Sequence, residues 1–138
     1  MAAKIRLEVV TPEGDVVNDE AKIVMAPGSL GEFGVLAGHT PFLTTLKLGT
    51  LRYEDASGTE RCVFIDGGFA EALPNKVTIL AEDAQRRCDI DIAQARSSVE
   101  RAQKRLEEAK ATDLEYTRLR IALEKSLHRL RVAESKMR

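Results

Sequence analysis

Few residues of this chain have both the chemical type and the spacing that catalysis or metal binding requires. Its 138 residues include two cysteines, Cys62 and Cys88, and two histidines, His39 and His128. The cysteines are 26 positions apart, with no CxxC motif and no neighbouring histidine pair, so the sequence indicates no zinc site. We expect both thiols to be reduced, and no metal to be bound.

Three other features could suggest a reactive site, and each has a simpler interpretation. The glycines of segment 27–34 could form a phosphate-binding loop, but neither a Lys-Ser/Thr pair nor a helix start follows them, so we interpret them as turn residues. His39 has no nucleophile or orienting acid that the sequence indicates, which favours a structural or contact role. The paired carboxylates at 54–55 and 82–83, and His128 on a polar helix face, are expected to be solvated. The sequence therefore predicts no catalytic residue, and we expect a protein that is not an enzyme.

The charges divide the chain into two differently built parts. Residues 1–84 contain 7 Lys/Arg and 13 Asp/Glu, whereas residues 85–138 contain 14 and 9, and the total net charge is only −1. All nine glycines and all four prolines lie before residue 75. We therefore expect a β plus α protein of two domains, with a β domain over 1–84, a hinge over 85–89 and a helical domain over 90–138.

The first part has the pattern of a β-sandwich or barrel. Apolar residues alternate with polar ones over 5–9, a second strand is predicted over 22–26, and a turn at 55–58 joins two strands between 51 and 65. A further strand is predicted over 77–81. The chain has no secretory signal and no apolar stretch of the roughly 20 residues that span a bilayer, so we expect a protein of the cytosolic side.

The second part predicts an antiparallel hairpin of two helices. Apolar residues recur at steps of three and four from Ile92 to Ala109, which predicts a helix over about 90–110, and Asp91 can cap its start. The capping box Thr112-Asp-Leu-Glu115 predicts the start of a second helix, with an apolar stripe of Tyr116, Leu119, Leu123, Leu127, Leu130, Ala133 and Met137. The first helix offers mainly alanine and valine to the second, so the hairpin needs another surface for stability.

The second helix is basic, with Arg118, Arg120, Lys125 and Arg129 among its cations. Aromatic residues are not interleaved with them, and their excess over acids is modest, so we expect an acidic protein surface as the partner and no nucleic acid. A solvated helix face remains the alternative explanation.

Four motifs in a fixed order resemble one family. They are the segment Gly31-Glu-Phe-Gly-Val-Leu-Ala-Gly-His-Thr-Pro-Phe-Leu43, the segment Gly67-Gly-Phe-Ala-Glu71, the segment Asn75-Lys-Val-Thr-Ile-Leu-Ala81 and a two-helix tail. Together they resemble the epsilon subunit of bacterial F-type ATP synthase, the counterpart of the chloroplast epsilon and mitochondrial delta subunits. The resemblance covers the whole chain and implies a flattened ten-stranded β-sandwich followed by the two-helix hairpin.

The family implies a non-catalytic rotor subunit. Its sandwich binds the gamma subunit and rests on the polar loops of the c-ring, where Glu32 and His39 match the contact segment. Its hairpin either folds against the sandwich or extends into the alpha/beta catalytic hexamer, where Arg118, Arg120, Lys125 and Arg129 would meet acidic loops and stop ATP hydrolysis. The resemblance also implies a peripheral protein on the cytoplasmic face of the bacterial plasma membrane, attached to the membrane only through the complex.

Some members of the family bind regulatory ATP at the folded hairpin. Four residues match the positions that hold it: Asp91, Ala95, Arg101 and Arg129. Gln85, Gln94 and Lys125 stand where the pattern has other charged residues, and these changes should weaken ATP binding. No cofactor is required, and an ATP-sensing module is the alternative function.

Overall fold

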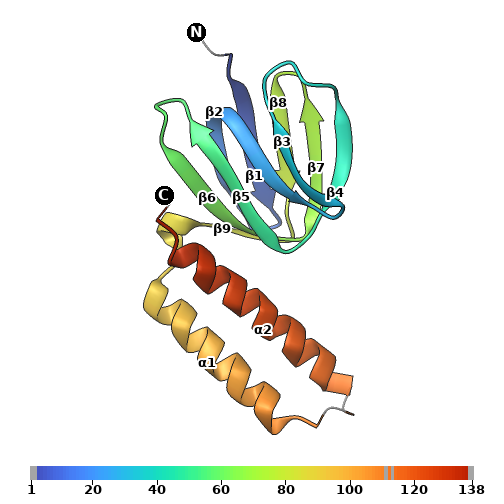
Figure 1. Cartoon of the computed structure of the whole chain (residues 1–138), viewed down its shortest axis with the longest axis vertical. Coiled ribbons are helices and arrows are strands. Elements are labelled where there is room, and N and C mark those ends of the chain that lie inside the picture. Colours follow the sequence, from blue (N-terminus) through green and yellow to red (C-terminus); the bar gives the residue numbers. More distant parts are fainter. Residues whose placement is uncertain (1–2, 111, 113, 137–138) are drawn as a thin grey trace.

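The computed structural model describes residues 3–110, 112 and 114–136, which form a β-sandwich followed by two antiparallel helices (Figure 1). The elements are β1 Ile5–Thr11, β2 Gly14–Gly28, β3 Gly31–Val35, β4 Phe42–Leu46, β5 Gly49–Asp55, β6 Glu60–Asp66, β7 Gly68–Leu73, β8 Lys76–Leu80, β9 Asp83–Arg86, the 3₁₀ helix η1 Arg87–Asp89, α1 Ile92–Glu108 and α2 Leu114–Ala133. The expected fold class is confirmed.

The strands follow the order β1-β8-β7-β4-β2-β5-β6-β9, with β3 beside β2. The long β2 joins the two layers, because its first half pairs with β1 and its second half with β5 and β3. The described residues form nine strands rather than the expected ten, with β2 running as one 15-residue strand.

Alternating apolar residues fill the space between the layers, as the period-two pattern predicts. Leu7, Val24, Leu51 and Ile79 are all completely buried there. The predicted pair of strands between 51 and 65 is present as β5 and β6, with Leu51 opposite Val63 in the register. This core makes the sandwich a rigid base for the helices.

The turn between β5 and β6 depends on Asp55, whose side chain is buried rather than solvated as the sequence suggested. Its carboxylate accepts hydrogen bonds from the backbone N–H groups of Ser57 and Thr59, both at 3.0 Å, and from Arg61 Nε at 2.7 Å. The Arg61 guanidinium and then the Ser57 hydroxyl hold the pKa of this carboxyl well below its usual range. The acid is thus a structural part of the turn.

The helices begin and end close to the predicted positions, but the buried face of α2 differs from the predicted apolar stripe. Asp91 caps α1 by accepting a hydrogen bond from the Gln94 N–H at 3.1 Å, which confirms the predicted cap. Asp113 of the capping box and Met137 of the apolar stripe lie outside the described residues. Leu127 was expected in the buried stripe, but it is 39% exposed, and Val132 is buried instead.

Strand β9 ends at Arg86 and so includes the first two residues of the segment 85–89 that was expected to be the hinge. Gln85 and Arg86 pair with Phe64 and Val63 of β6, so they belong to the sheet. The chain leaves the sheet only at η1, which leads directly to the Asp91 cap of α1. None of the helices in the described residues is long and apolar enough to cross a membrane.

Candidate functional site

The junction between the sandwich and the helical hairpin combines apolar packing, ion pairs and hydrogen bonds. A small apolar cluster, separate from the main core, lies there and consists of Cys62, Phe64, Ile90, Ala95, Val132 and Ala133. The two β6 residues belong to the outer face of the sandwich, which the ends of α1 and α2 cover at this point (Figure 1). The hairpin is therefore docked by its end nearest the sandwich, and most of its length extends away.

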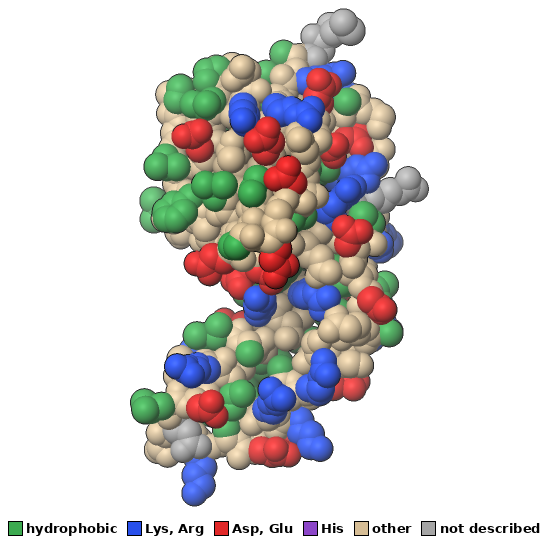
Figure 2. All heavy atoms as spheres, turned by 180° about the vertical axis from the view of Figure 1, so that it is seen from behind, with side chains coloured by type: hydrophobic (Ala, Val, Ile, Leu, Met, Phe, Trp, Pro, Cys, Tyr) green, Lys and Arg blue, Asp and Glu red, His purple; other side chains and the backbone are tan. Residues whose placement is uncertain are grey.

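Lys125 links α2 to the sandwich electrostatically. Its Nζ lies 3.2 Å from an Asp66 oxygen and 3.0 Å from an Asp83 oxygen. These two acids are opposite each other in the β6–β9 register, so the ammonium also separates two like charges. Burial lowers the pKa of Lys125, but the bonds to Asp83 and Asp66 outweigh burial and raise the pKa overall. Figure 2 shows acidic side chains on the sandwich edge that faces the basic hairpin.

His128 is a second link, and the prediction that it is solvated is wrong. Its Nε2 lies 2.8 Å from the Thr50 hydroxyl oxygen, and its ring centroid lies 6.2 Å from that of Phe64. The side chain is half-buried between α2 and the outer face of β5 and β6. Burial, followed by the positive charge of Arg131, lowers the pKa of His128.

Arg129 makes a third link by joining three elements of the chain. Its Nε donates to the Gln85 amide oxygen of β9 at 2.8 Å, and its Nη1 donates to the Gln94 amide oxygen of α1 at 2.7 Å. We call these three side chains the Arg129 clasp. Nearby, Arg87 Nε donates to the backbone carbonyl of Ser135 at 3.1 Å, which holds the end of the chain against η1.

The residues predicted to contact ATP do not form one cluster. Asp91 and Arg129 lie at the junction, where Ala95 is completely buried in the apolar cluster. Arg101 lies further along α1 and donates to the Ser98 hydroxyl at 3.3 Å. It lines a groove of about 250 Å³ between the helices, together with Ser98, Ala102, Arg105, Leu119, Ala122 and Ser126. Lys125 instead faces the sandwich.

The residues predicted to contact partners fall on three different surfaces. Glu32 of β3 forms an ion pair with Arg52 of β5 at 2.7 Å, while its side chain stays 45% exposed. The half-buried His39 packs on Phe42 with 5.4 Å between ring centroids, and it makes no side-chain hydrogen bond within the described residues. Arg118 and Arg120 are exposed on α2.

A separate apolar surface covers the outer face of β4, β7 and β8. Leu43, Phe69 and Leu80 are 70%, 53% and 54% exposed there. Figure 2 shows hydrophobic side chains gathered on this side of the sandwich. A hollow of about 340 Å³ lies beside them and is lined by Val10, Thr11, Pro12, Gly68, Phe69, Leu80, Ala81 and Glu82. Exposed apolar area of this kind is typical of a protein-binding surface.

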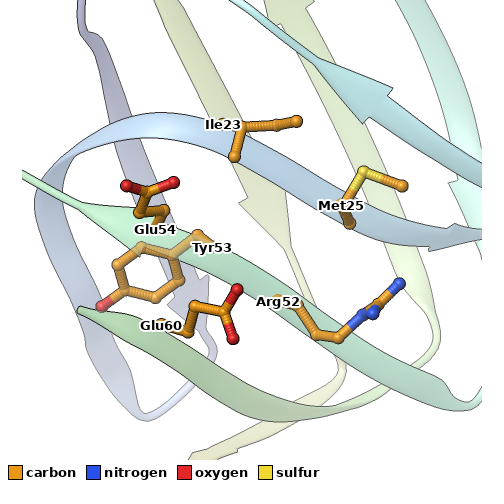
Figure 3. A pocket seen from close by; sticks show the side chains of 6 residues that line it. All are labelled: Ile23, Met25, Arg52, Tyr53, Glu54 and Glu60. Carbon is orange, nitrogen blue, oxygen red and sulfur yellow. The ribbon is translucent and has the colours of Figure 1, made fainter. Parts of the chain in front are cut away.

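A smaller hollow of about 90 Å³ lies on the outer face of β2, β5 and β6 (Figure 3). Two of its three charged side chains already have partners, since Arg52 pairs with Glu32 and Glu54 pairs with Lys22 at 3.6 Å. Tyr53 is directed away from it, and burial and then its hydrogen bond to Asp19 raise the pKa of Tyr53. The arrangement brings no nucleophile next to a base. Nor do the described residues contain a group of three His, Cys, Asp or Glu that could hold a metal ion.

Sequence reasoning missed several junction residues, although two signals were available. Thr50 and Phe64 belong to no motif, and their partner His128 is distant in the sequence. However, β6 contains an apolar run over 62–65 that is buried throughout, which is typical of a strand covered on both faces. The spacing of Lys125, His128 and Val132 also places them on one helical face.

Comparisons with known proteins agree with this architecture. Family models described as "ATP synthase, Delta/Epsilon chain" match the beta-sandwich domain over residues 4–87 and the long alpha-helix domain over 89–134. The ATP synthase epsilon chain of Desulforapulum autotrophicum is 54% identical over 136 residues, covering 99% of this chain and 100% of that one. That of Syntrophobacter fumaroxidans is 52% identical over 134 residues, covering 97% and 98%.

A solved structure is similar over most of the chain. It belongs to the mitochondrial ATP synthase of Euglena gracilis (OSCP/F1/c-ring), has a TM-score of 0.73 at 26% identity, and the match covers 88% of this chain and 76% of that one. The resemblance seen in the sequence motifs is thereby confirmed. The chain belongs to the ATP synthase delta/epsilon chain family, as an accessory epsilon subunit of the central stalk and not a catalytic subunit.

Proposed function

We propose that this epsilon subunit connects the gamma shaft to the c-ring through its sandwich, and inhibits ATP hydrolysis through a mobile hairpin. The observation that supports inhibition by a mobile hairpin is the small size of the junction between hairpin and sandwich. Six buried residues and the links of Lys125, His128 and Arg129 hold the docked form. Such a junction can open without unfolding either domain.

The surface of α2 supports a second docking position outside the sandwich. Leu114, Ile121 and Leu127 are exposed large apolar residues, which a further partner could cover. Arg118 and Arg120 are exposed and have no ion pair in the described part of the chain. Acidic loops of the alpha/beta hexamer would complement these cations in the extended form. The hinge of this movement would be η1, where the chain leaves the sheet.

Two sandwich surfaces would contact the rotor. The apolar surface of β4, β7 and β8 suits the gamma subunit, because burial of Leu43, Phe69 and Leu80 would favour a permanent contact. Glu32 and His39 lie in the segment that the family resemblance assigns to the polar loops of the c-ring. The bacterial relatives support a position on the cytoplasmic face of the plasma membrane, with attachment only through the complex.

ATP sensing is the alternative function, and the Arg129 clasp argues against it as the main output. Gln85 and Gln94 already accept hydrogen bonds from the Arg129 guanidinium, and their neutral amides supply no charge for phosphate. The docked hairpin is therefore held without a nucleotide. Calorimetric titration of the isolated subunit with millimolar MgATP tests this alternative. We expect no heat of binding. A saturable heat of binding in the wild type that is absent from Arg129→Ala would favour the ATP-sensing function.

Removal of residues 88–138 tests the inhibitory function directly. We expect the truncated subunit to support assembly and proton-coupled ATP synthesis, while ATP hydrolysis by the membranes rises. Unchanged hydrolysis would exclude inhibition by the hairpin.

The charge reversal Arg118→Glu with Arg120→Glu should relieve inhibition in the same way. Its matched control reverses two exposed cations of α1, Lys104→Glu with Arg105→Glu, and should leave inhibition intact.

A further inference from the structure

His128 is a titratable group inside the junction for which the proposed function gives no role. Its ring fills the space between α2 and two strands, with the Thr50 hydroxyl at 2.8 Å, a further hydrogen bond to the Gly49 backbone, and the Phe64 ring centroid at 6.2 Å. Thr50, Gly49 and Phe64 are uncharged. The sandwich therefore accommodates a neutral imidazole and offers the ring no carboxylate.

The charged groups of the surrounding elements also disfavour a cation at this position. On α2 itself, the guanidinium of Arg131 acts on the ring, and Glu124, one turn earlier, is exposed to solvent. The acids that β6 and β9 bring to the junction are Asp66 and Asp83, and Lys125 binds both.

The remaining elements, η1 and α1, add two cations that have partners and one acid that is exposed to solvent. From η1, the Arg87 guanidinium is directed to the Ser135 carbonyl, and Asp89 is exposed beside Cys88. From α1, Arg96 forms its ion pair with Glu134 at 3.7 Å. A proton on His128 would thus place a new charge in a half-buried junction where Lys125 already binds Asp66 and Asp83, while the junction acids without an ion pair in the described residues, Glu124 and Asp89, are exposed to solvent.

We propose that protonation of His128 releases the hairpin from the sandwich, so that docking is sensitive to pH near neutrality. In the free hairpin the imidazole is solvated and can charge without penalty, whereas in the docked form burial and Arg131 disfavour the charged ring more than its hydrogen bond to the Gly49 backbone favours it. The consequence for the ATP synthase complex rests on the proposed function. If the extended hairpin inhibits ATP hydrolysis, acidification around the subunit would favour this inhibitory form.

The direction in which pH changes docking of the hairpin follows from proton linkage. Burial and Arg131 lower the pKa of docked His128 from its ordinary value of 6.5. Well above pH 6.5 both forms are neutral, and docking is independent of pH. Below it the undocked form binds the proton first, so the docking constant falls by up to about tenfold per pH unit until the docked pKa is reached.

Methyl NMR of the isolated full-length subunit between pH 8 and pH 5 tests the proposal without any ATPase measurement. The methyl signals of Val132 and Ala133 report docking, and those of Val24 and Ile79 in the main core report that the sandwich stays folded. We expect the docking signals to shift towards the undocked form in acid while the core signals stay unchanged. The imidazole signals of His128 should titrate below pH 6.5.

Variants of the two histidines separate this mechanism from general acid effects. His128→Gln keeps hydrogen-bonding capacity without a charge and should stay docked from pH 8 to pH 5, whereas His128→Lys should be undocked even at pH 8. The matched control His39→Gln should keep the wild-type transition. A wild-type chain equally docked at both ends of the range, a transition that persists in His128→Gln, or a His128 pKa at or above 6.5 would each overturn the proposal. Because the assay contains no other subunit, its result is independent of whether the hairpin inhibits hydrolysis.

Discussion

Lys125 of α2 and Asp83 of β9 lie 3.0 Å apart, so the hairpin is bound to the strand that immediately precedes η1. Asp66 completes the contact at 3.2 Å. The positive hairpin and the negative sandwich therefore neutralise part of each other's charge within one chain. An acidic loop of another protein would compete for the same cations, which couples release from the sandwich to docking elsewhere.

Replacing Lys125 with Gln should weaken this docking. The change removes two partly exposed ion pairs and leaves Asp66 opposite Asp83, for a combined loss of about 1 kcal/mol. Alkylation of Cys62 at constant pH measures the effect, because this thiol is 1% exposed under the docked hairpin. In a Cys88→Ser background we expect labelling to be about fivefold faster. The control Lys104→Gln on α1 should label at the parent rate, and equal rates for both variants would refute the link.

The turn at Asp55 should make the sandwich sensitive to strong acid. Its pKa is lower in the folded than in the unfolded chain, so its contribution to stability is complete above the unfolded value of 3.8. This contribution is lost as the pH falls below that value, because protonation removes the charge that Arg61 binds. In Asp55→Asn, the melting temperature should be lower at pH 7 and less dependent on pH between 5 and 2. Parallel melting curves for both proteins over that range would contradict the assignment.

Gly68 occupies a position that no other residue should tolerate. Its φ is +109°, and a Cβ atom there would lie 2.0 Å from the Leu80 carbonyl oxygen of the neighbouring strand. Gly68→Ala should therefore separate β7 from β8 and cost about 3 kcal/mol of unfolding free energy. Gly14→Ala is the matched control, since it has a similar φ of +132° but no atom within 4 Å of the added Cβ. In urea unfolding, the unfolding free energy of Gly14→Ala should be clearly higher than that of Gly68→Ala.

Local patterns were sufficient for most elements of the fold. The turn after Asp55 predicted the pairing of β5 with β6, and the Asp91 cap predicted the start of α1. These features depend on residues close together in the chain. The length of β2 was not predictable, because one strand serves both layers only when β1 and β5 are placed beside it.

The junction was harder to predict than the fold for the same reason. His128 and Thr50 are 78 positions apart, and Arg129 and Gln85 are 44 apart, so no local pattern connects them. A histidine among charged helix residues has the pattern of a solvated side chain until the sandwich covers it. The basic character of α2 predicted an acidic surface of another protein, and this stays a prediction; in the docked form Lys125 binds Asp66 and Asp83 of the same chain.

A reversible lock on the docked hairpin tests the central claim most directly. The Cys62 thiol is within hydrogen-bonding reach of the Ser135 side chain, so Ser135→Cys in a Cys88→Ser background places two thiols together at the junction. The measurement is ATP hydrolysis by the catalytic complex reconstituted with this subunit, oxidised and then reduced. We predict that the oxidised, docked subunit does not inhibit, that reduction restores inhibition, and that the Cys88→Ser control is insensitive to oxidation. Equal inhibition by the locked and reduced subunit would contradict a hairpin that must leave the sandwich to act.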